Sequence, residues 1–208
     1  MKNPAVQKFA PFVLLLIVAV LALFVPQLPS YAGEYSAADI AWILVATALV
    51  FIMTPGLAFF YGGMVHRKNI ISTMIKSMVS AGIVSVIWIS FGYSLCFGES
   101  INGIIGNPMT HLFFKDVVNG APSLQGGTPM TIPLLLFAIF QLMFAIITPG
   151  LIVGAVAERI KFTSYILFIV LFIILVYAPL AHLSWHHQGF LLKIVDIDFD
   201  GVTFVHIS

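Results

Sequence analysis

Four long stretches of this 208-residue sequence carry almost no charge. They cover residues 40–65, 71–97, 131–157 and 162–185, and Lys76 is the single Asp, Glu, Lys or Arg residue within them. Each stretch is long enough to cross the roughly 30 Å hydrocarbon core of a bilayer as a helix. Backbone groups in lipid must pair internally, and the period-two alternation of a membrane barrel is absent. The sequence therefore predicts an all-α, polytopic membrane helix bundle.

The composition supports an integral membrane protein and argues against several other classes. Apolar residues make up 61% of the chain and charged residues 8%, whereas a soluble domain carries about 25% charged residues. A net charge of +1 without a basic face predicts no nucleic-acid partner. The sequence has no phosphate-binding loop, nucleophile elbow or metalloprotease signature, so we expect no enzyme and no cofactor. Cys96 is the single cysteine and no Cys/His cluster has zinc spacing, so we expect no disulfide within the chain and no metal site.

The first 32 residues have the pattern of a secretory signal peptide. Lys2 and Lys8 precede an uncharged run over residues 12–25, and a small residue, Ala32, ends the segment. Fourteen helical residues reach only about 21 Å, which is short for a membrane span. We predict cleavage after Ala32, with an uncleaved additional helix as the alternative.

Basic residues in the short connections predict the orientation in the membrane. Arg67 and Lys68 lie between the first two spans, and Arg159 and Lys161 lie between the third and fourth. By the positive-inside rule these connections are cytoplasmic. The mature amino terminus is then predicted to lie outside.

Three aromatic residues are candidates for a binding surface near the outer face. Phe140 and Phe144 are four positions apart, so they share one face of the third span and could form a gate. Lipid contact or core packing is the alternative for both. Trp185, at the outer end of the fourth span, is either an interfacial anchor or a surface for a cation, because the indole face is the best cation–π partner among side chains.

Two polar residues near the carboxyl end complete the candidate set. A fifth apolar segment begins near residue 201 and, at the length given, is truncated. Asp198 precedes it as a predicted helix N-cap that could also place negative potential at an outer vestibule. His206 lies within it, and an ionisable residue in a hydrophobic span is a functional candidate. A buried histidine satisfied by a neighbour is the alternative reading of His206.

Several motifs, in the same order along the chain, resemble those of the ammonium transporter family (Amt/Mep/Rh), and specifically its Amt branch. The resemblance covers Asp39 to Ser208. The segments that carry it are Met53–Gly63, Phe91–Leu95, Gly150–Arg159, Tyr177–His182 and Val205–Ser208.

The resemblance implies a fold and a function. Family members resemble one another in having eleven membrane helices in inverted repeats, assembled as homotrimers with one pore per subunit. Residues 33–208 would then be the amino-terminal part of such a domain, with five helices, and would not enclose a pore alone. The implied activity is transport of ammonium or ammonia across a cell membrane, and a PII-type regulatory protein is an implied partner.

The resemblance also assigns roles to individual residues. Phe140 and Phe144 match phenylalanines of the third helix, Phe144 being one ring of the outer gate. Trp185 matches the vestibule tryptophan and Asp198 the aspartate that supports the vestibule. His206 matches the first of two pore histidines.

Two departures and two alternatives qualify these expectations. The family usually has glycines after the vestibule tryptophan, whereas this chain has His186 and His187, and Asp200 stands where a small residue is usual. We therefore expect a reshaped vestibule. The alternative functions are an ammonium-sensing membrane domain of a signalling protein and a non-transporting, truncated remnant.

Overall fold

The computed structural model describes residues 13–14, 16–21, 23–24, 33–122, 124–125 and 128–192. Most of the predicted signal peptide, residues 1–32, lies outside these ranges, so its cleavage stays a prediction. The expected fifth span, from about residue 201, also lies outside the described residues.

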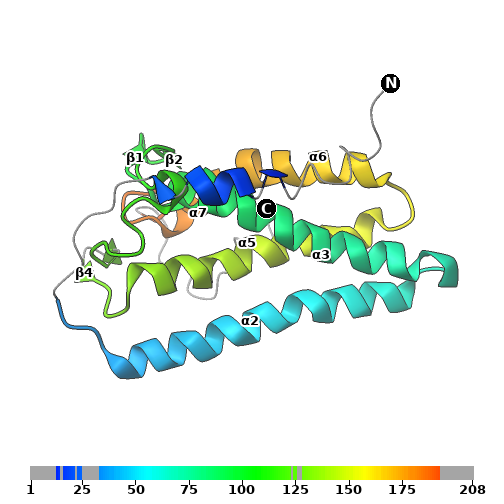
Figure 1. Cartoon of the computed structure of the whole chain (residues 1–208), viewed down its shortest axis with the longest axis horizontal. Helices are drawn as coiled ribbons and strands as arrows, with labels where there is room; N and C mark the ends of the chain where they lie inside the picture. The colour runs from blue at the N-terminus through cyan, green and yellow to red at the C-terminus, as the bar shows by residue number, and fades with distance from the viewer. Residues whose placement is uncertain are drawn as a thin grey trace.

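Four helical segments in the described part of the chain are long and apolar enough to cross a membrane (Figure 1). The predicted all-α membrane bundle is confirmed in this part. Two of the segments are single helices, and each of the other two contains a five-residue π-helical turn. The elements are α2 (Ala37–Met64), α3 (Ile70–Ile87), η2 (Trp88–Gly92), α4 (Tyr93–Phe97), α5 (Leu134–Val156), α6 (Phe162–Phe172), η4 (Ile173–Tyr177) and α7 (Ala178–Trp185).

Short elements connect the spans. The 3-10 turn η1 (Arg67–Asn69) joins α2 to α3. The longer connection before α5 contains two small antiparallel hairpins and a second 3-10 turn. These are β1 (Ser100–Ile101) with β2 (Ile105–Gly106), β3 (Leu124–Gln125) with β4 (Thr128–Pro129), and η3 (Leu112–Phe114).

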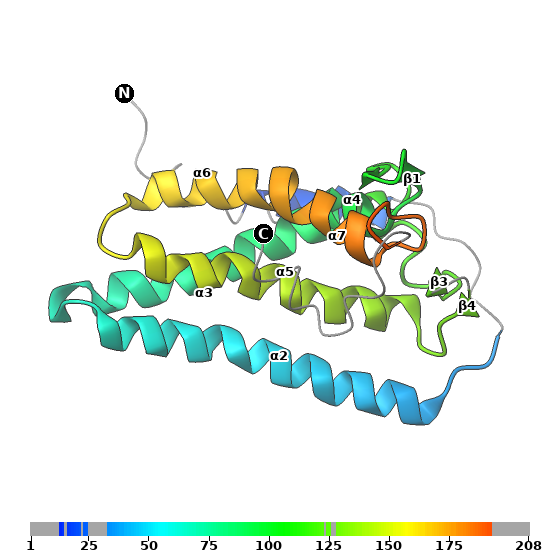
Figure 2. The same ribbon diagram turned by 180° about the vertical axis from the view of Figure 1, so that it is seen from behind.

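The long helices lie side by side, and both hairpins lie at one end of the bundle (Figures 1 and 2). Helix α2 packs on α3 and α5, α3 packs on α5 and α6, and the short helices α4 and α7 pack on each other. The hairpins belong to the connection that carries few basic residues. By the positive-inside rule, this is the end predicted to face outward.

A hydrogen-bonded contact fixes the start of α2 to the start of α5. The Ser36 hydroxyl caps α2 by accepting from the Asp39 backbone N–H at 3.3 Å. The Ser36 N–H donates to the Thr131 carbonyl at 2.9 Å, and the Thr131 hydroxyl donates to the Asp39 carboxylate. The amino-terminal ends of two spans far apart in sequence are thereby joined at the same membrane face.

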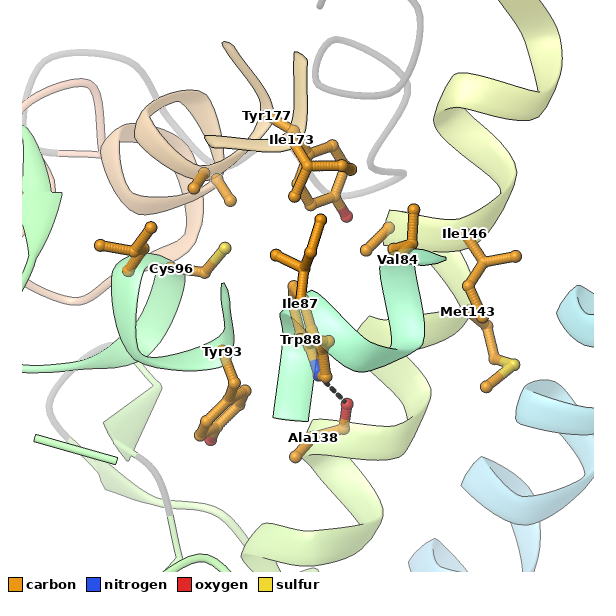
Figure 3. Packing of buried hydrophobic residues seen from close by; sticks show 14 of the residues in the cluster. Val84, Ile87, Trp88, Tyr93, Cys96, Ala138, Met143, Ile146, Ile173 and Tyr177 are labelled. Atoms are coloured by element: carbon orange, nitrogen blue, oxygen red, sulfur yellow. Dashed lines mark hydrogen bonds between the residues drawn. The ribbon is translucent and has the colours of Figure 1, made fainter. Parts of the chain in front are cut away.

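Buried aromatic residues of the two π-helical turns are in contact. Trp88 of η2 and Tyr177 of η4 are both buried, with ring centroids 6.5 Å apart. The Trp88 indole N–H donates to the Ala138 carbonyl of α5 at 3.1 Å (Figure 3). Tyr93 packs edge-on against Trp88 at 5.8 Å. Residues from three spans therefore meet around Trp88.

The sequence offers local reasons for both π-helical turns. Pro179 has no backbone N–H, and its ring collides with the carbonyl four residues earlier in a regular helix, so a wider turn before α7 relieves the conflict. Gly92 closes the other wide turn, where an added Cβ would lie 3.1 Å from the Ile87 carbonyl oxygen. Hydropathy predicted both spans but not these interruptions, because it carries no information on hydrogen-bond register.

The single charged residue of α3 is buried near the basic end of the bundle. Lys76 of α3 is 4% exposed, and its ammonium donates to the Ile160 carbonyl of the α5–α6 connection at 3.4 Å. A long lysine side chain can bury its methylenes and direct its charge toward a helix end. Lys76 is thus accommodated in an otherwise uncharged span.

Candidate functional site

The candidate site is an aromatic cluster formed by α5 and the end of α7. The rings of Phe140 and Phe144 are in edge-to-face contact, with centroids 5.1 Å apart and planes at 82°. Phe144 makes a second edge-to-face contact with Trp185, at 6.0 Å and 72°. All three side chains are half-buried. The structure therefore brings together the three aromatic residues singled out from the sequence.

The local structure explains how α5 presents its two rings. The four-residue spacing places Phe140 and Phe144 one above the other on a helix face. The Phe144 carbonyl also accepts from the Thr148 hydroxyl at 2.7 Å. Two residues before Phe140, the Ala138 carbonyl of α5 accepts a hydrogen bond from the Trp88 indole. This bond restricts rotation of α5 about its axis.

A buried polar residue that follows Phe140 in the chain was not singled out from the sequence. Gln141 follows Phe140 in α5, and its side chain is 7% exposed. Its amide oxygen has no hydrogen-bond partner among the described residues. An unpaired buried acceptor costs free energy, which makes such positions candidates for contact with a polar group. A single glutamine in an apolar span was the available signal.

Histidines precede and follow Trp185 in the chain. His182, one turn earlier in α7, is fully buried, and its ring accepts or donates two hydrogen bonds: to the Cys96 carbonyl at 2.9 Å and the Ser100 hydroxyl at 2.8 Å. His186 stacks on His182 with centroids 4.3 Å apart and planes at 16°. His182 thereby connects α7 to the end of α4 and to β1.

His186 lies just beyond the membrane span, and its ring is held neutral. Burial lowers the pKa of His186 to about 3, and the neighbouring rings of His182 and His187 act in the same direction. The ring Nδ1 accepts from the Gln188 backbone N–H at 3.2 Å, which requires this nitrogen to be unprotonated. The residue that follows Trp185 in the chain therefore carries an uncharged imidazole.

At the opposite end, Glu158 joins the two basic connections. One carboxylate oxygen accepts from the His66 backbone N–H at 2.8 Å and from the Asn69 side-chain amide at 2.9 Å. These bonds, first that of Asn69 and then that of His66, lower the pKa of Glu158. Glu158 also adopts a left-handed backbone conformation with φ of 64°.

A cavity of about 250 Å³ lies beside this connection. Its lining residues come from the ends of α2 and α5 and are Tyr61, Met64, Val65, Gly154, Ala157 and Glu158. The phenolic hydroxyl of Tyr61 donates to the Leu151 carbonyl at 3.0 Å across the α2–α5 contact. The chain thus has an aromatic cluster at one end and an open cavity at the end with the basic connections.

The remaining residues predicted for the site cannot be placed. Asp198, predicted at the vestibule, and His206, predicted in the pore, lie outside the described residues, as does Asp200. In the part of the chain that the structure describes, no group of three or more His, Cys, Asp or Glu side chains is arranged to hold a metal ion.

These features define a multi-pass membrane protein whose helices carry an aromatic cluster at one end. The chain belongs to the ammonium transporter family, since the model of the Ammonium Transporter Family matches residues 41–208.

Individual relatives agree with this family. A putative ammonium transporter of Methanothermobacter thermautotrophicus is 50% identical over 172 residues, which cover 82% of this chain and 40% of the relative. An ammonium transporter of Mycobacterium tuberculosis is 42% identical over 194 residues, covering 85% of this chain and 41% of the relative. The chain thus spans about two fifths of the length of these relatives.

Solved structures show the same fold. Mep2 of Saccharomyces cerevisiae superposes with a TM-score of 0.74 at 33% identity, covering 84% of this chain and 37% of Mep2. A protein described as a sensor Amt protein superposes with a TM-score of 0.70 at 29% identity, covering 81% of this chain and 40% of that protein.

Proposed function

We propose that this chain forms part of a transmembrane pathway for ammonium or ammonia and supplies the outer surface that first binds the cation. The observation that carries this proposal is the edge-to-face contact between Phe144 and Trp185, which come from two different spans. Membership of the ammonium transporter family supports the substrate.

The chemistry of the cluster suits a small cation. An indole face attracts a cation by about 0.5–1 kcal/mol at exposed sites and by about 2 kcal/mol or more where water is excluded. The half-buried environment of Trp185 and Phe144 lies between these limits. Below such a surface, an apolar passage strongly disfavours a charged group. Ammonium can release a proton and continue as neutral ammonia, whereas a metal cation of similar size cannot.

Two residues outside the described ranges complete this proposal. Asp198 would support the vestibule by capping the fifth span and by its negative charge. His206 would hydrogen-bond the passing molecule, because a neutral imidazole has one donor and one acceptor. Phe140 and Phe144 would close the outer entrance between passages. These roles rest on the sequence resemblance.

The location and the partners are part of the same proposal. The basic residues of the α2–α3 and α5–α6 connections support a cytoplasmic position for that end in the cell membrane, with the mature amino terminus outside. Assembly as a homotrimer and regulation by a PII-type protein are proposed on the family resemblance. Because the chain spans about two fifths of its relatives, we propose that transport requires further helices that complete the pore.

Uptake by a completed protein tests the function. The chain would be continued with the segment of the Methanothermobacter thermautotrophicus relative that follows the matched region, and uptake of methylammonium into proteoliposomes would be measured. We expect Trp185→Leu to raise the half-saturating concentration roughly 3- to 30-fold, the equivalent of about 0.7–2 kcal/mol of lost cation–π attraction.

Trp42→Leu is the matched control, since Trp42 lies on α2 with 73% of its surface exposed. Equal half-saturating concentrations for Trp185→Leu and Trp42→Leu would contradict the assignment of Trp185. Absence of saturable uptake in the completed parent protein would contradict the transport function itself.

Sensing is a second candidate, favoured by the similarity to the sensor Amt protein. A sensor requires binding at the outer surface but no passage. Methylammonium binding to the completed protein without uptake into proteoliposomes would favour sensing over transport.

A further inference from the structure

The segment around Trp185 contains a column of three imidazole rings that the proposed transport role does not use. His182 stacks on His186 with centroids 4.3 Å apart and planes at 16°. His186 in turn contacts His187, also at 4.3 Å but with planes at 40°. His182 and His186 are buried, with 0% and 6% of their surfaces exposed. The column begins in α7 and continues past its end.

The first ring of the column is fixed to a different part of the bundle. A carbonyl can only accept, so the 2.9 Å contact of His182 Nδ1 with the Cys96 carbonyl assigns the ring proton to Nδ1. Nε2 then accepts from the Ser100 hydroxyl at 2.8 Å. The Ser100 oxygen accepts in turn from the Gly103 N–H at 3.1 Å. His182 thereby joins α7 to the end of α4 and to the β1–β2 hairpin.

The second ring closes the turn that follows Trp185. The His186 N–H donates to the His182 carbonyl at 3.2 Å, and the His186 carbonyl accepts from the Gly189 N–H at 2.8 Å. His186 Nδ1 accepts from the Gln188 N–H at 3.2 Å. The turn is so tight that a Cβ on Gly189 would lie 2.4 Å from the carbonyl oxygens of His182 and Leu183. Trp185 therefore precedes a tight turn, and in the chain it stands between two residues whose rings are stacked.

We propose that His186 is a positioning residue: by stacking on His182, it holds the turn after Trp185 so that the indole stays edge-to-face with Phe144. This inference rests on the proposed role of Trp185 in receiving the cation. An aromatic surface binds a cation well only when its face is held in place before the cation arrives. With the ring of residue 186 removed, the helix end loses its packing against His182 and Trp185 gains rotamers that leave Phe144.

Fluorine NMR of the 208-residue chain in lipid nanodiscs tests this placement directly. Labelling with 5-fluorotryptophan yields one resonance each for Trp42, Trp88 and Trp185, which are assigned by single Trp→Phe substitutions. We expect His186→Ala to shift or broaden the Trp185 resonance while the Trp42 and Trp88 resonances stay in place. Methylammonium chloride, compared with sodium chloride at equal ionic strength, should shift the Trp185 resonance with a midpoint about 3- to 10-fold higher in His186→Ala.

Two further variants separate the stack from the hydrogen bond. His186→Phe keeps a planar ring on His182 and should restore both the Trp185 resonance and the methylammonium midpoint. His186→Gln keeps a hydrogen-bonding group without a ring and should resemble His186→Ala. The Trp88 resonance also shifts if His186→Ala disturbs the fold. In that case the comparison of His186→Phe with His186→Gln decides whether ring stacking or hydrogen bonding positions Trp185. Restoration by Gln rather than Phe would overturn the proposal, as would an unchanged Trp185 resonance in His186→Ala.

The two proposals fail in distinguishable ways. The position of the Trp185 resonance without methylammonium reports on His186 alone. If methylammonium shifts no tryptophan resonance in the parent chain, the binding role of Trp185 is contradicted. His186 would then still position Trp185, but not for cation binding.

Discussion

Phe144 and Trp185 are in edge-to-face contact at a centroid distance of 6.0 Å, with the two ring planes inclined by 72°. One ring belongs to α5 and the other to the last residue of α7, so the contact joins two spans. Phe140 extends it by a second edge-to-face contact on α5. This aromatic cluster is the part of the predicted vestibule that the structure describes.

Replacing Phe144 by leucine should lower the affinity for the cation more than it lowers the stability of the fold. In Phe144→Leu the side chain stays apolar but no longer supports the indole, and an aromatic pair contributes about 0.5–1.5 kcal/mol beyond its buried area. We expect the methylammonium midpoint, followed by the Trp185 fluorine resonance, to rise roughly 2- to 10-fold. Phe60→Leu is the control, because Phe60 is 60% exposed on α2. Equal midpoints for the two variants would argue against a role for Phe144.

The close contact between α2 and α5 should be sensitive to a single methyl group at Gly154. A Cβ there would lie 2.3 Å from the Tyr61 ring, whereas a Cβ on Gly63 would meet nothing within 4 Å. Gly154→Ala forces Tyr61 to move away from the Leu151 carbonyl and should destabilise the fold by about 1–3 kcal/mol. Gly63→Ala, in an exposed helical position, should be neutral or slightly stabilising. Unfolding in mixed detergent micelles measures both, and equal midpoints would refute this account of the α2–α5 contact.

Acidification should destabilise the turn that contains His186. Its folded-state pKa of about 3 lies below the ordinary value of 6.5, so the open turn binds a proton that the closed turn does not. The stabilisation is complete above about pH 6.5 and is lost progressively as the pH falls toward 3, by up to about 1.4 kcal/mol per pH unit. Between pH 7 and pH 5 we expect a loss of up to about 2 kcal/mol in the free energy of unfolding. His186→Phe cannot titrate, so its loss over the same interval should be smaller; an identical loss would contradict the prediction.

Removing the Glu158 carboxylate should loosen the contact between the two basic connections. In Glu158→Ala the His66 N–H loses its acceptor, so its hydrogen exchange should become faster. Glu158→Gln keeps a carbonyl oxygen as acceptor and should preserve most of the protection. The pKa of Glu158 is lowered by these bonds, so their stabilisation is complete above the ordinary pKa of a glutamate and is lost as the pH falls from there through the lowered pKa. Unchanged exchange at His66 in Glu158→Ala would show that the bond does not hold these connections together.

Part of the candidate site followed from spacing in the sequence. Phe140 and Phe144 were predicted to share a helix face, and their rings are in contact. A four-residue spacing is local information, because helical geometry alone brings such residues together. The contact of Phe144 with Trp185 is different in kind, since it depends on how α5 and α7 pack.

Other parts had only a weak signal in the sequence. The pattern His186-His187 predicted a reshaped vestibule, but it did not indicate that His186 stacks on His182 in the preceding turn. The single glutamine at position 141 did not reveal that its amide oxygen is buried without a hydrogen-bond partner among the described residues. The stack joins residues four positions apart at the end of α7, whereas the burial of Gln141 depends on residues from other elements, which no local pattern specifies.

The sequence by itself determined that this is a multi-pass membrane protein and where its four described spans lie, because the transfer of apolar residues into lipid sums over a local stretch of chain. Its ordered motifs also sufficed to indicate the ammonium transporter family. Only the tertiary structure decided that Trp88 packs against Tyr177, that His182 is fixed to the end of α4, and that Trp185 rests against Phe144. These features depend on which helix faces meet, and this is settled by contacts between residues far apart in the chain.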